Sequence, residues 1–245
     1  MTVGVRFLGS GNAFADGGRS HACVHVTAPG VSLLLDCGGS ALPAITRLGL
    51  ADGIDAIAVS HLHGDHFGGI PYLVIQQHFA GRTRPLVVAG PRGLAARLAA
   101  TEQGLYPDFF GHTKLGFALR VAVLGTDEIA LGGAKVAALA VRHVALADPH
   151  GLRVRVGDRL VAYSGDATWS EHLPRVAKGA DLFICEATNF ELDDPAHLSY
   201  RTLMEHRGEL DCRRIVLTHL GATTLAHLAE LELDYATDGK TIELA

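Results

Sequence analysis

A histidine-rich turn directly after a short apolar strand constrains this chain of 245 residues more than any other feature. The turn, Ser60–His66, reads SHLHGDH and follows the apolar residues Ile57–Val59. Side chains two apart in an extended backbone share a face, so His61 and His63 project to the same side. The aspartate and the last histidine then turn around the intervening glycine toward a neighbouring point. One loop thus offers ligands to two adjacent metal ions; the alternative is a histidine-rich surface loop.

Two metal sites need more ligands than one loop supplies, and three residues at the ends of other predicted strands fit. His143, Asp166 and His219 each follow or end an apolar strand, where open α/β sheets carry their functional sites. A lone strand-end histidine is ordinary, but four such strand exits together are not. Imidazole and carboxylate groups are the donors that Zn²⁺ takes, with Mn²⁺, Fe²⁺ or Ni²⁺ as alternatives.

The pattern HLHGDH resembles the HxHxDH signature of the metallo-β-lactamase superfamily, and the later His, Asp and His fall in the family's order. The resemblance implies two divalent metal ions: the first held by His61, His63 and His143, the second by Asp65, His66 and His219, with Asp166 bridging them. It also implies the α/β fold of this superfamily, a four-layer αβ/βα sandwich. We expect residues 1–245 to form a single domain of this kind.

The periodicity of the chain gives an element order that suits two sheets packed face to face with helices outside. Strands are predicted at Val3–Leu8, Ala22–Thr27, Val31–Leu35, Asp55–Ser60, Pro85–Gly90, Phe117–Leu124, Glu128–Leu131, Ala134–Val141, Gly151–Val156, Leu160–Ser164, Asp181–Glu186 and Arg213–His219. Helices are predicted at Ala41–Leu48, Gly68–Phe79 and Leu94–Glu102, and near Ser199–Arg207 and Thr224–Leu231.

Two cations ~3.5–4 Å apart would hold a shared water as hydroxide at neutral pH, and this metal-bridging hydroxide is the expected nucleophile. Asp65 could ligate one cation and also orient the hydroxide or accept its proton. Such a centre suits phosphodiesters, thioesters, lactones and lactams alike. The metal ligands therefore predict hydrolysis without naming a substrate.

Several other segments resemble ribonuclease Z and its small phosphodiesterase relatives. They are Phe7–Ala13 followed by Gly17–Arg19, Leu33–Gly38, Cys185–Thr188, His197–Ser199 and Ile215–Leu220. By this resemblance His197 would be the general acid that protonates the leaving oxygen, a task suited to an imidazole with a pKa of about 6.5. Glu186 would support the site from behind the ligands. The alternatives are an exposed loop histidine and a carboxylate that only caps a turn.

Two differences from the ribonuclease Z group narrow the range of expected substrates. Cys185 stands where the group usually has His. Only 22 residues separate His143 from Asp166, and the chain has no arm of glycine, proline and basic residues of the kind that binds tRNA. The net charge of −5 also removes the usual electrostatic contribution to tRNA binding. We therefore expect a phosphodiesterase for a small or cyclic substrate. A tRNA 3′-processing endoribonuclease, a thioester, lactone or lactam hydrolase, and a non-enzymatic metal-binding accessory protein are the alternatives.

The composition of the chain restricts the cellular location that we expect for the protein. No apolar run reaches the ~18 residues that span a bilayer, and no secretory leader opens the sequence, so a cytoplasmic location without membrane contact is expected. The four cysteines are far apart and form no CxxC pair, which favours buried thiols in a reducing compartment. A homodimer is implied by the resemblance alone.

Overall fold

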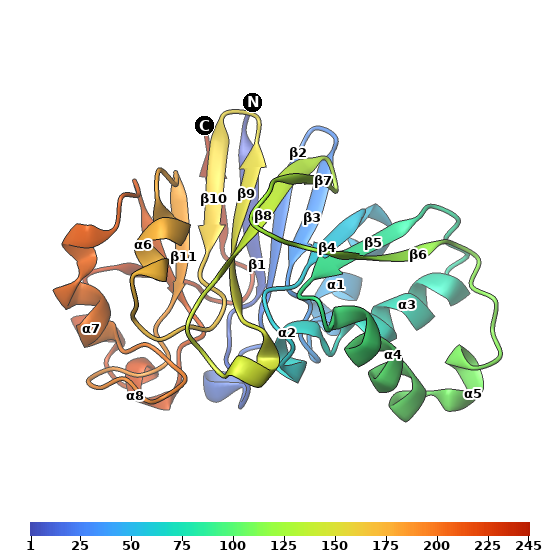
Figure 1. Ribbon diagram of the computed structural model, residues 1–245, viewed down its shortest axis with the longest axis horizontal. Helices are drawn as coiled ribbons and strands as arrows, with labels where there is room; N and C mark the ends of the chain where they lie inside the picture. The colour runs from blue at the N-terminus through green and yellow to red at the C-terminus, as the bar shows by residue number, and fades with distance from the viewer.

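Two seven-stranded sheets packed face to face organise the chain in the computed structural model, which describes residues 1–245 (Figure 1). The strand order is β14-β1-β2-β3-β4-β5-β6 in the first sheet and β13-β12-β11-β10-β9-β8-β7 in the second. Helices cover the outer face of each sheet, as Figure 1 shows for α1, α3 and α4 on one side and α6 and α7 on the other. This is the predicted αβ/βα sandwich.

The elements have the following bounds. The first sheet contains β1 Val3–Gly9, β2 Cys23–Ala28, β3 Val31–Leu35, β4 Ala56–Ala58, β5 Leu86–Gly90, β6 Leu119–Val123 and β14 Thr241–Leu244. The second contains β7 Ile129–Leu131, β8 Ala134–Ala140, β9 His150–Val156, β10 Arg159–Tyr163, β11 Leu182–Glu186, β12 Ile215–Thr218 and β13 Asp234–Tyr235. The helices are α1 Leu42–Arg47, α2 Gly64–Phe67, α3 Ile70–Phe79, α4 Leu94–Leu105, α5 Pro107–Phe110, α6 His172–Ala177, α7 Tyr200–Glu205 and α8 Ala222–Leu225. Short 3₁₀ turns are η1 Asp16–Gly18, η2 Ala51–Gly53, η3 Ala145–Ala147, η4 Arg207–Glu209 and η5 Leu228–Glu230.

Strands in the middle of each sheet are buried on both faces, which explains why they read as continuous apolar runs. In β3, Leu33 and Leu35 pack against the second sheet, whereas Leu34 packs against the covering helices. The inner core joins side chains of β1–β4 to side chains of β8–β12. No helix of the structure combines the length and the apolar character needed to cross a membrane.

The predicted elements are present with small shifts at their ends, apart from the C-terminal region. The final helix predicted near Thr224–Leu231 is two separate turns, α8 and η5. Strands β13 and β14 were not predicted, because two to four residues of mixed polarity carry no periodic signal. β14 exists because β1 offers its open edge to residues more than 230 positions away.

The direction of the strands brings the predicted site residues to one end of the sandwich. Strands β3 and β4 are parallel, as are β10, β11 and β12, and β8 runs the same way as β10 because both are antiparallel to β9. The carboxyl ends of parallel strands meet at the same edge of a sheet. The loops after β1, β4, β8, β10, β11 and β12 therefore gather at the lower end in Figure 1.

A buried histidine of the first sheet gives a testable pH dependence of stability. The side chain of His25 is 6% exposed and its Nε2 lies 3.0 Å from Ser32 Oγ. Burial, with the charge of Arg6 on the neighbouring strand, lowers the pKa of His25 to about 4. The unfolded chain, with a pKa near 6.5, binds this proton more tightly. His25 therefore costs the native state stability as the pH falls from about 6.5 to 4, by up to about 3 kcal/mol.

We expect replacement of His25 by Gln to flatten that part of the profile. Urea unfolding of chelator-treated protein at pH 4.5 and pH 7 should show a smaller loss of unfolding free energy in His25→Gln than in the unsubstituted chain. His112→Gln, at an exposed position, serves as the matched control and should follow the unsubstituted profile. Equal pH slopes for His25→Gln and the unsubstituted chain would contradict the assignment.

Candidate metal centre

The histidine-rich turn leaves β4 and passes directly into a short helix. His63 is the last extended residue before α2, with φ −87° and ψ 148°, and Asp65 and His66 lie in the single turn of that helix. The change of direction predicted at Gly64 is the start of α2 and not a glycine-specific kink, since a Cβ at Gly64 would meet open space. Because the backbone is extended up to His63 and helical after it, His61 and His63 point to one group of possible ligands, and Asp65 and His66 point to another.

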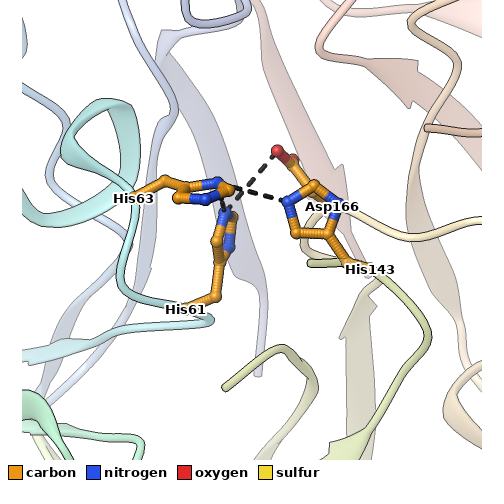
Figure 2. A group of neighbouring side chains, drawn as sticks. All are labelled: His61, His63, His143 and Asp166. Atoms are coloured by element: carbon orange, nitrogen blue, oxygen red, sulfur yellow. Dashed lines mark hydrogen bonds and ion pairs between the residues drawn. The ribbon is translucent and has the colours of Figure 1, made fainter. Parts of the chain in front are cut away.

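A first group of possible ligands consists of His61, His63, His143 and Asp166 (Figure 2). Their donor atoms all lie within 4.8 Å of one another. His63 Nδ1 lies 3.1 Å from His61 Nε2 and 3.2 Å from His143 Nε2. His61 Nε2 lies 3.6 Å from Asp166 Oδ2.

The second group consists of Asp65, His66, Asp166 and His219, all of them buried. His66 Nε2 lies 3.3 Å from Asp65 Oδ2 and 3.2 Å from Asp166 Oδ1. His219 Nε2 lies 3.3 Å and 3.4 Å from the same two oxygens. The structure thus brings together all seven residues that the sequence predicted as metal ligands.

Asp166 belongs to both groups and faces each with a different oxygen. Its Oδ2 is directed to His61 of the first group, and its Oδ1 to His66 and His219 of the second. Oδ1 is buried and accepts no hydrogen bond, an arrangement that is costly unless a cation satisfies the oxygen. Tetrahedral zinc with bonds of ~2.0–2.1 Å places neighbouring ligand atoms roughly 3.4 Å apart. The distances in both groups match that spacing, so the residues fit divalent cations.

Electrostatics favour the ligating forms of two side chains. Burial, with the positive charge of the His66 ring, holds the pKa of His61 well below its usual range, which leaves the imidazole neutral. Burial alone would raise the pKa of Asp166, but the rings of His219, His66 and His61 outweigh it and keep the carboxylate charged. Neutral imidazole and charged carboxylate are the forms that bind metal.

The rings of His61, His66 and His143 are each oriented by a partner on the nitrogen that faces away from the centre. His66 Nδ1 donates to Asp36 Oδ2 at 2.7 Å, and His143 Nδ1 donates to the carbonyl oxygen of Ala196 at 2.6 Å. Ser60 Oγ donates to Asp36 Oδ2 and accepts from His61 Nδ1, at 2.8 and 3.0 Å. Such partners fix the tautomer in which Nε2 carries the free lone pair. The Nε2 atoms of these three rings therefore point into the two groups, whereas His63 faces the first group with Nδ1.

On the other side of the centre, His219 is held through Thr188. His219 Nδ1 lies 2.9 Å from Thr188 Oγ1, which donates to Glu186 Oε2 at 2.6 Å. Both carboxylate oxygens of Glu186 lie 3.2 Å from His197 Nδ1. The buried Glu186 thus connects His219 to His197, and with them it forms a third group of possible ligands.

His197 lies beside both groups, with its ring centroid 5.1 Å from that of His143 and 5.4 Å from that of His219. Its Nδ1 is 3.9 Å from Asp166 Oδ2, and its side chain is 23% exposed. Burial lowers the pKa of His197, but the hydrogen bond and charge of Glu186, with the charge of Asp166, raise it to about 9. The backbone N–H of His197 donates to Asp194 Oδ1 at 2.8 Å, which fixes the loop. The imidazolium can therefore hold a proton beside the centre.

Sequence reasoning gave no role to three residues that orient the rings: Asp36, Ser60 and Thr188. Asp36 ends the apolar strand Val31–Leu35 in the same way that Asp166 follows β10, and this signal could have identified it. Its φ of +59° is unusual for a residue other than glycine. The hydroxyl groups of Ser60 and Thr188 carry no comparable signal, because serine and threonine are common at strand ends.

Comparison with known proteins agrees with this geometry. A ribonuclease Z from Methanothermobacter thermautotrophicus is 27% identical over 88% of this chain and 86% of its own length. The short form of human tRNase Z is 25% identical with a TM-score of 0.76, covering 98% of both chains. Two further structures share the fold. A diphosphatase of the PhnP family is 18% identical with a TM-score of 0.77, covering 99% of this chain and 98% of that one. The metallo-β-lactamase fold protein YhfI from Bacillus subtilis is 21% identical with a TM-score of 0.77, covering 100% of both chains.

These likenesses identify a metal-dependent hydrolase of the metallo-β-lactamase superfamily that is similar to ribonuclease Z. The family model described as "Anti-Pycsar protein Apyc1" matches residues 3–239, nearly the whole chain. The chain therefore belongs to the Anti-Pycsar protein Apyc1 family.

Proposed function

We propose that this protein is a phosphodiesterase that binds two divalent metal ions, zinc first among them, and hydrolyses a small or cyclic phosphodiester. The observation that carries the proposal is Asp166, whose two oxygens face two separate groups of imidazole and carboxylate donors. A carboxylate in that position suits a bridge between two cations. When bound, the cations supply Lewis-acid activation of water and neutralise charge that develops on phosphoryl oxygens.

The side chains around the centre divide the remaining work. Asp65 Oδ2 lies 3.3 Å from the Nε2 atoms of both His66 and His219. Asp65 can therefore hold a cation and also orient the attacking water or accept its proton. His197 donates the proton that the leaving oxygen needs, from Nε2, because Nδ1 is engaged by Glu186. Glu186 keeps the ring charged and correctly turned. General-acid assistance matters for a poor leaving group, and the alkoxide released from an alkyl phosphodiester is one.

Relatives and charge both bear on the substrate. The similar proteins include enzymes named ribonuclease Z and a diphosphatase, which supports phosphorus–oxygen bond cleavage over thioester, lactone or lactam hydrolysis. The segment between His143 and Asp166 is taken up by η3, β9 and β10 of the second sheet. Together with the net charge of −5, this favours a small substrate over tRNA, whose phosphates would repel a net negative protein.

A substrate screen tests the proposal directly. Protein reconstituted with Zn²⁺ or Mn²⁺ is expected to cleave bis(p-nitrophenyl) phosphate and a nucleoside 3′,5′-cyclic phosphate, with a precursor tRNA as a slow or inert substrate. Product formation by chromatography and metal content by mass spectrometry are measured on the same preparation. Cleavage of a thioester or lactone in place of the phosphodiesters would overturn the proposal. Efficient 3′ processing of the precursor tRNA would assign the larger substrate instead.

Replacing Asp166 by Asn should remove metal and activity together. The amide keeps the shape but loses the charge and one anionic donor shared by both groups, so we expect bound metal to fall below one ion per chain. Phosphodiesterase activity should fall by at least about 100-fold, since even partners behind metal ligands are worth 10–100-fold. The matched control is Asp108→Asn on the exposed face of α5. Full metal content and activity in Asp166→Asn would rule out a bridging role.

The proposed general-acid role of His197 can be tested by comparing substrates with different leaving groups. His197→Gln should retain both metal ions and lose about 10²- to 10⁴-fold in kcat on an alkyl phosphodiester, whose alkoxide needs protonation. Hydrolysis of bis(p-nitrophenyl) phosphate, which releases a stable phenolate, should change far less. His172→Gln, on α6, is the control substitution. Equal losses on both substrates would show that His197 acts on structure or metal binding and not as the acid.

A further inference from the structure

An open cavity of about 250 Å³ adjoins the second group of ligands. It lies between the loop after β1, the loop after β11 and the start of α8, which Figure 1 shows at the same end of the molecule. His197 and His219 line the cavity and also belong to the centre. A substrate whose phosphate lies between the metal ligands therefore has room for a substituent here.

Phe14 lines the cavity, and this aromatic residue is 85% exposed. Apart from the ring, the turn that carries Phe14 is firmly held. Asn12 is 3% exposed, and its Oδ1 accepts the backbone N–H groups of Phe14 and Asp16, each at 3.2 Å. Asp16 Oδ2 in turn accepts from Asn12 Nδ2 and from the backbone N–H of Ala222 on α8, both at 2.9 Å. The backbone at Phe14 is thus fixed, and its apolar ring is exposed to solvent.

Other residues that line the cavity are polar. Asn189 and Asp194 are two of them, with Asn189 Nδ2 donating to Asp194 Oδ2 at 2.9 Å. Asp194 Oδ1 also accepts the backbone N–H groups of Ala196 and His197, at 2.7 and 2.8 Å, which orders this part of the lining. A cavity that combines an aromatic side chain with amide and carboxylate groups suits a planar heteroaromatic ring, which stacks through its face and hydrogen-bonds through its edge.

We propose that Phe14 is a specificity-determining residue that stacks on a planar heteroaromatic ring, such as a nucleobase, carried by the substrate. This rests on the proposed phosphodiesterase function and deepens it by placing the ring in the cavity beside His197 and His219. Because the backbone of the turn is ordered before binding, stacking must order only the side chain of Phe14. A contact remote from the reacting phosphorus stabilises the bound substrate and the transition state alike, so it acts on KM and not on kcat.

A matched pair of substrates tests the ring contact. Adenosine 3′,5′-cyclic monophosphate and methyl ribofuranoside 3,5-cyclic phosphate share the reacting bond and differ in the base. For Phe14→Leu, which keeps an apolar side chain without a π-face, we expect KM for the adenosine ester to rise about 5- to 150-fold, the loss measured for one base–aromatic stack. The abasic ester should change less than about twofold, and Phe14→Trp should retain the discrimination. The control is Leu146→Ala, which is 88% exposed on η3 and does not line the cavity.

A binding measurement separates this inference from the proposed function. Calorimetric titration of metal-reconstituted protein with adenosine 5′-monophosphate and with ribose 5-phosphate reports the ring contact without turnover. If Phe14→Leu weakens the binding of adenosine 5′-monophosphate and not that of ribose 5-phosphate, the stacking role is supported, even where neither cyclic ester is cleaved. Failure to cleave either cyclic ester would contradict only the proposed phosphodiesterase function. Equal effects of Phe14→Leu on base-containing and abasic ligands, or no effect on either, would overturn the role of Phe14.

Discussion

The buried carboxylate of Asp166 is the group on which the arrangement of the centre depends. It carries negative charge with only 2% of its side chain exposed, among the imidazoles of His61, His66 and His219. Burying an isolated carboxylate is costly, and only opposite charge and well-placed donors repay that cost. The surrounding rings meet part of this requirement, and the proposed cations would meet the rest, which would couple metal binding to the folding of several strand ends.

The residues behind the ligands show how the fold holds that charge in place. Asp36 and His219 both adopt φ of +59°, a region that costs non-glycine residues of order 1–3 kcal/mol. In each case the strained backbone directs a side chain into the network: Asp36 toward His66 and Ser60, and His219 toward Asp65 and Thr188. The apolar layers on both faces of the central strands supply the stability that maintains such conformations. The orientation of the rings thus depends on unfavourable backbone conformations at Asp36 and His219.

The loops at this end of the sandwich also line the cavity beside the candidate metal centre. The turn from Asn12 to Asp16 is tied to α8, and the backbone of the loop that carries His197 is tied to Asp194. Residues of both segments line the cavity next to His219. The backbone around the cavity is therefore ordered. In the proposed function, the metal ligands and the shape of this cavity together narrow the range of substrates.

The sequence by itself determined the ligand types, the apolar strands and the αβ/βα order. Local signals sufficed for these, since the periodicity of strands such as Val31–Leu35 and the spacing of HLHGDH are properties of adjacent residues. Strands β13 and β14, the division of the last helix and the roles of Asp36, Ser60 and Thr188 were decided only by tertiary structure. Two of these depend on partners distant in sequence: β14 pairs with the free edge of β1, and Thr188 contacts His219. The residues next to β14 or Thr188 along the chain carry no signal for such contacts, because the contacts form only when the sheets assemble. In the case of Thr188 and His219, the parallel strands β11 and β12 bring their carboxyl ends to one edge.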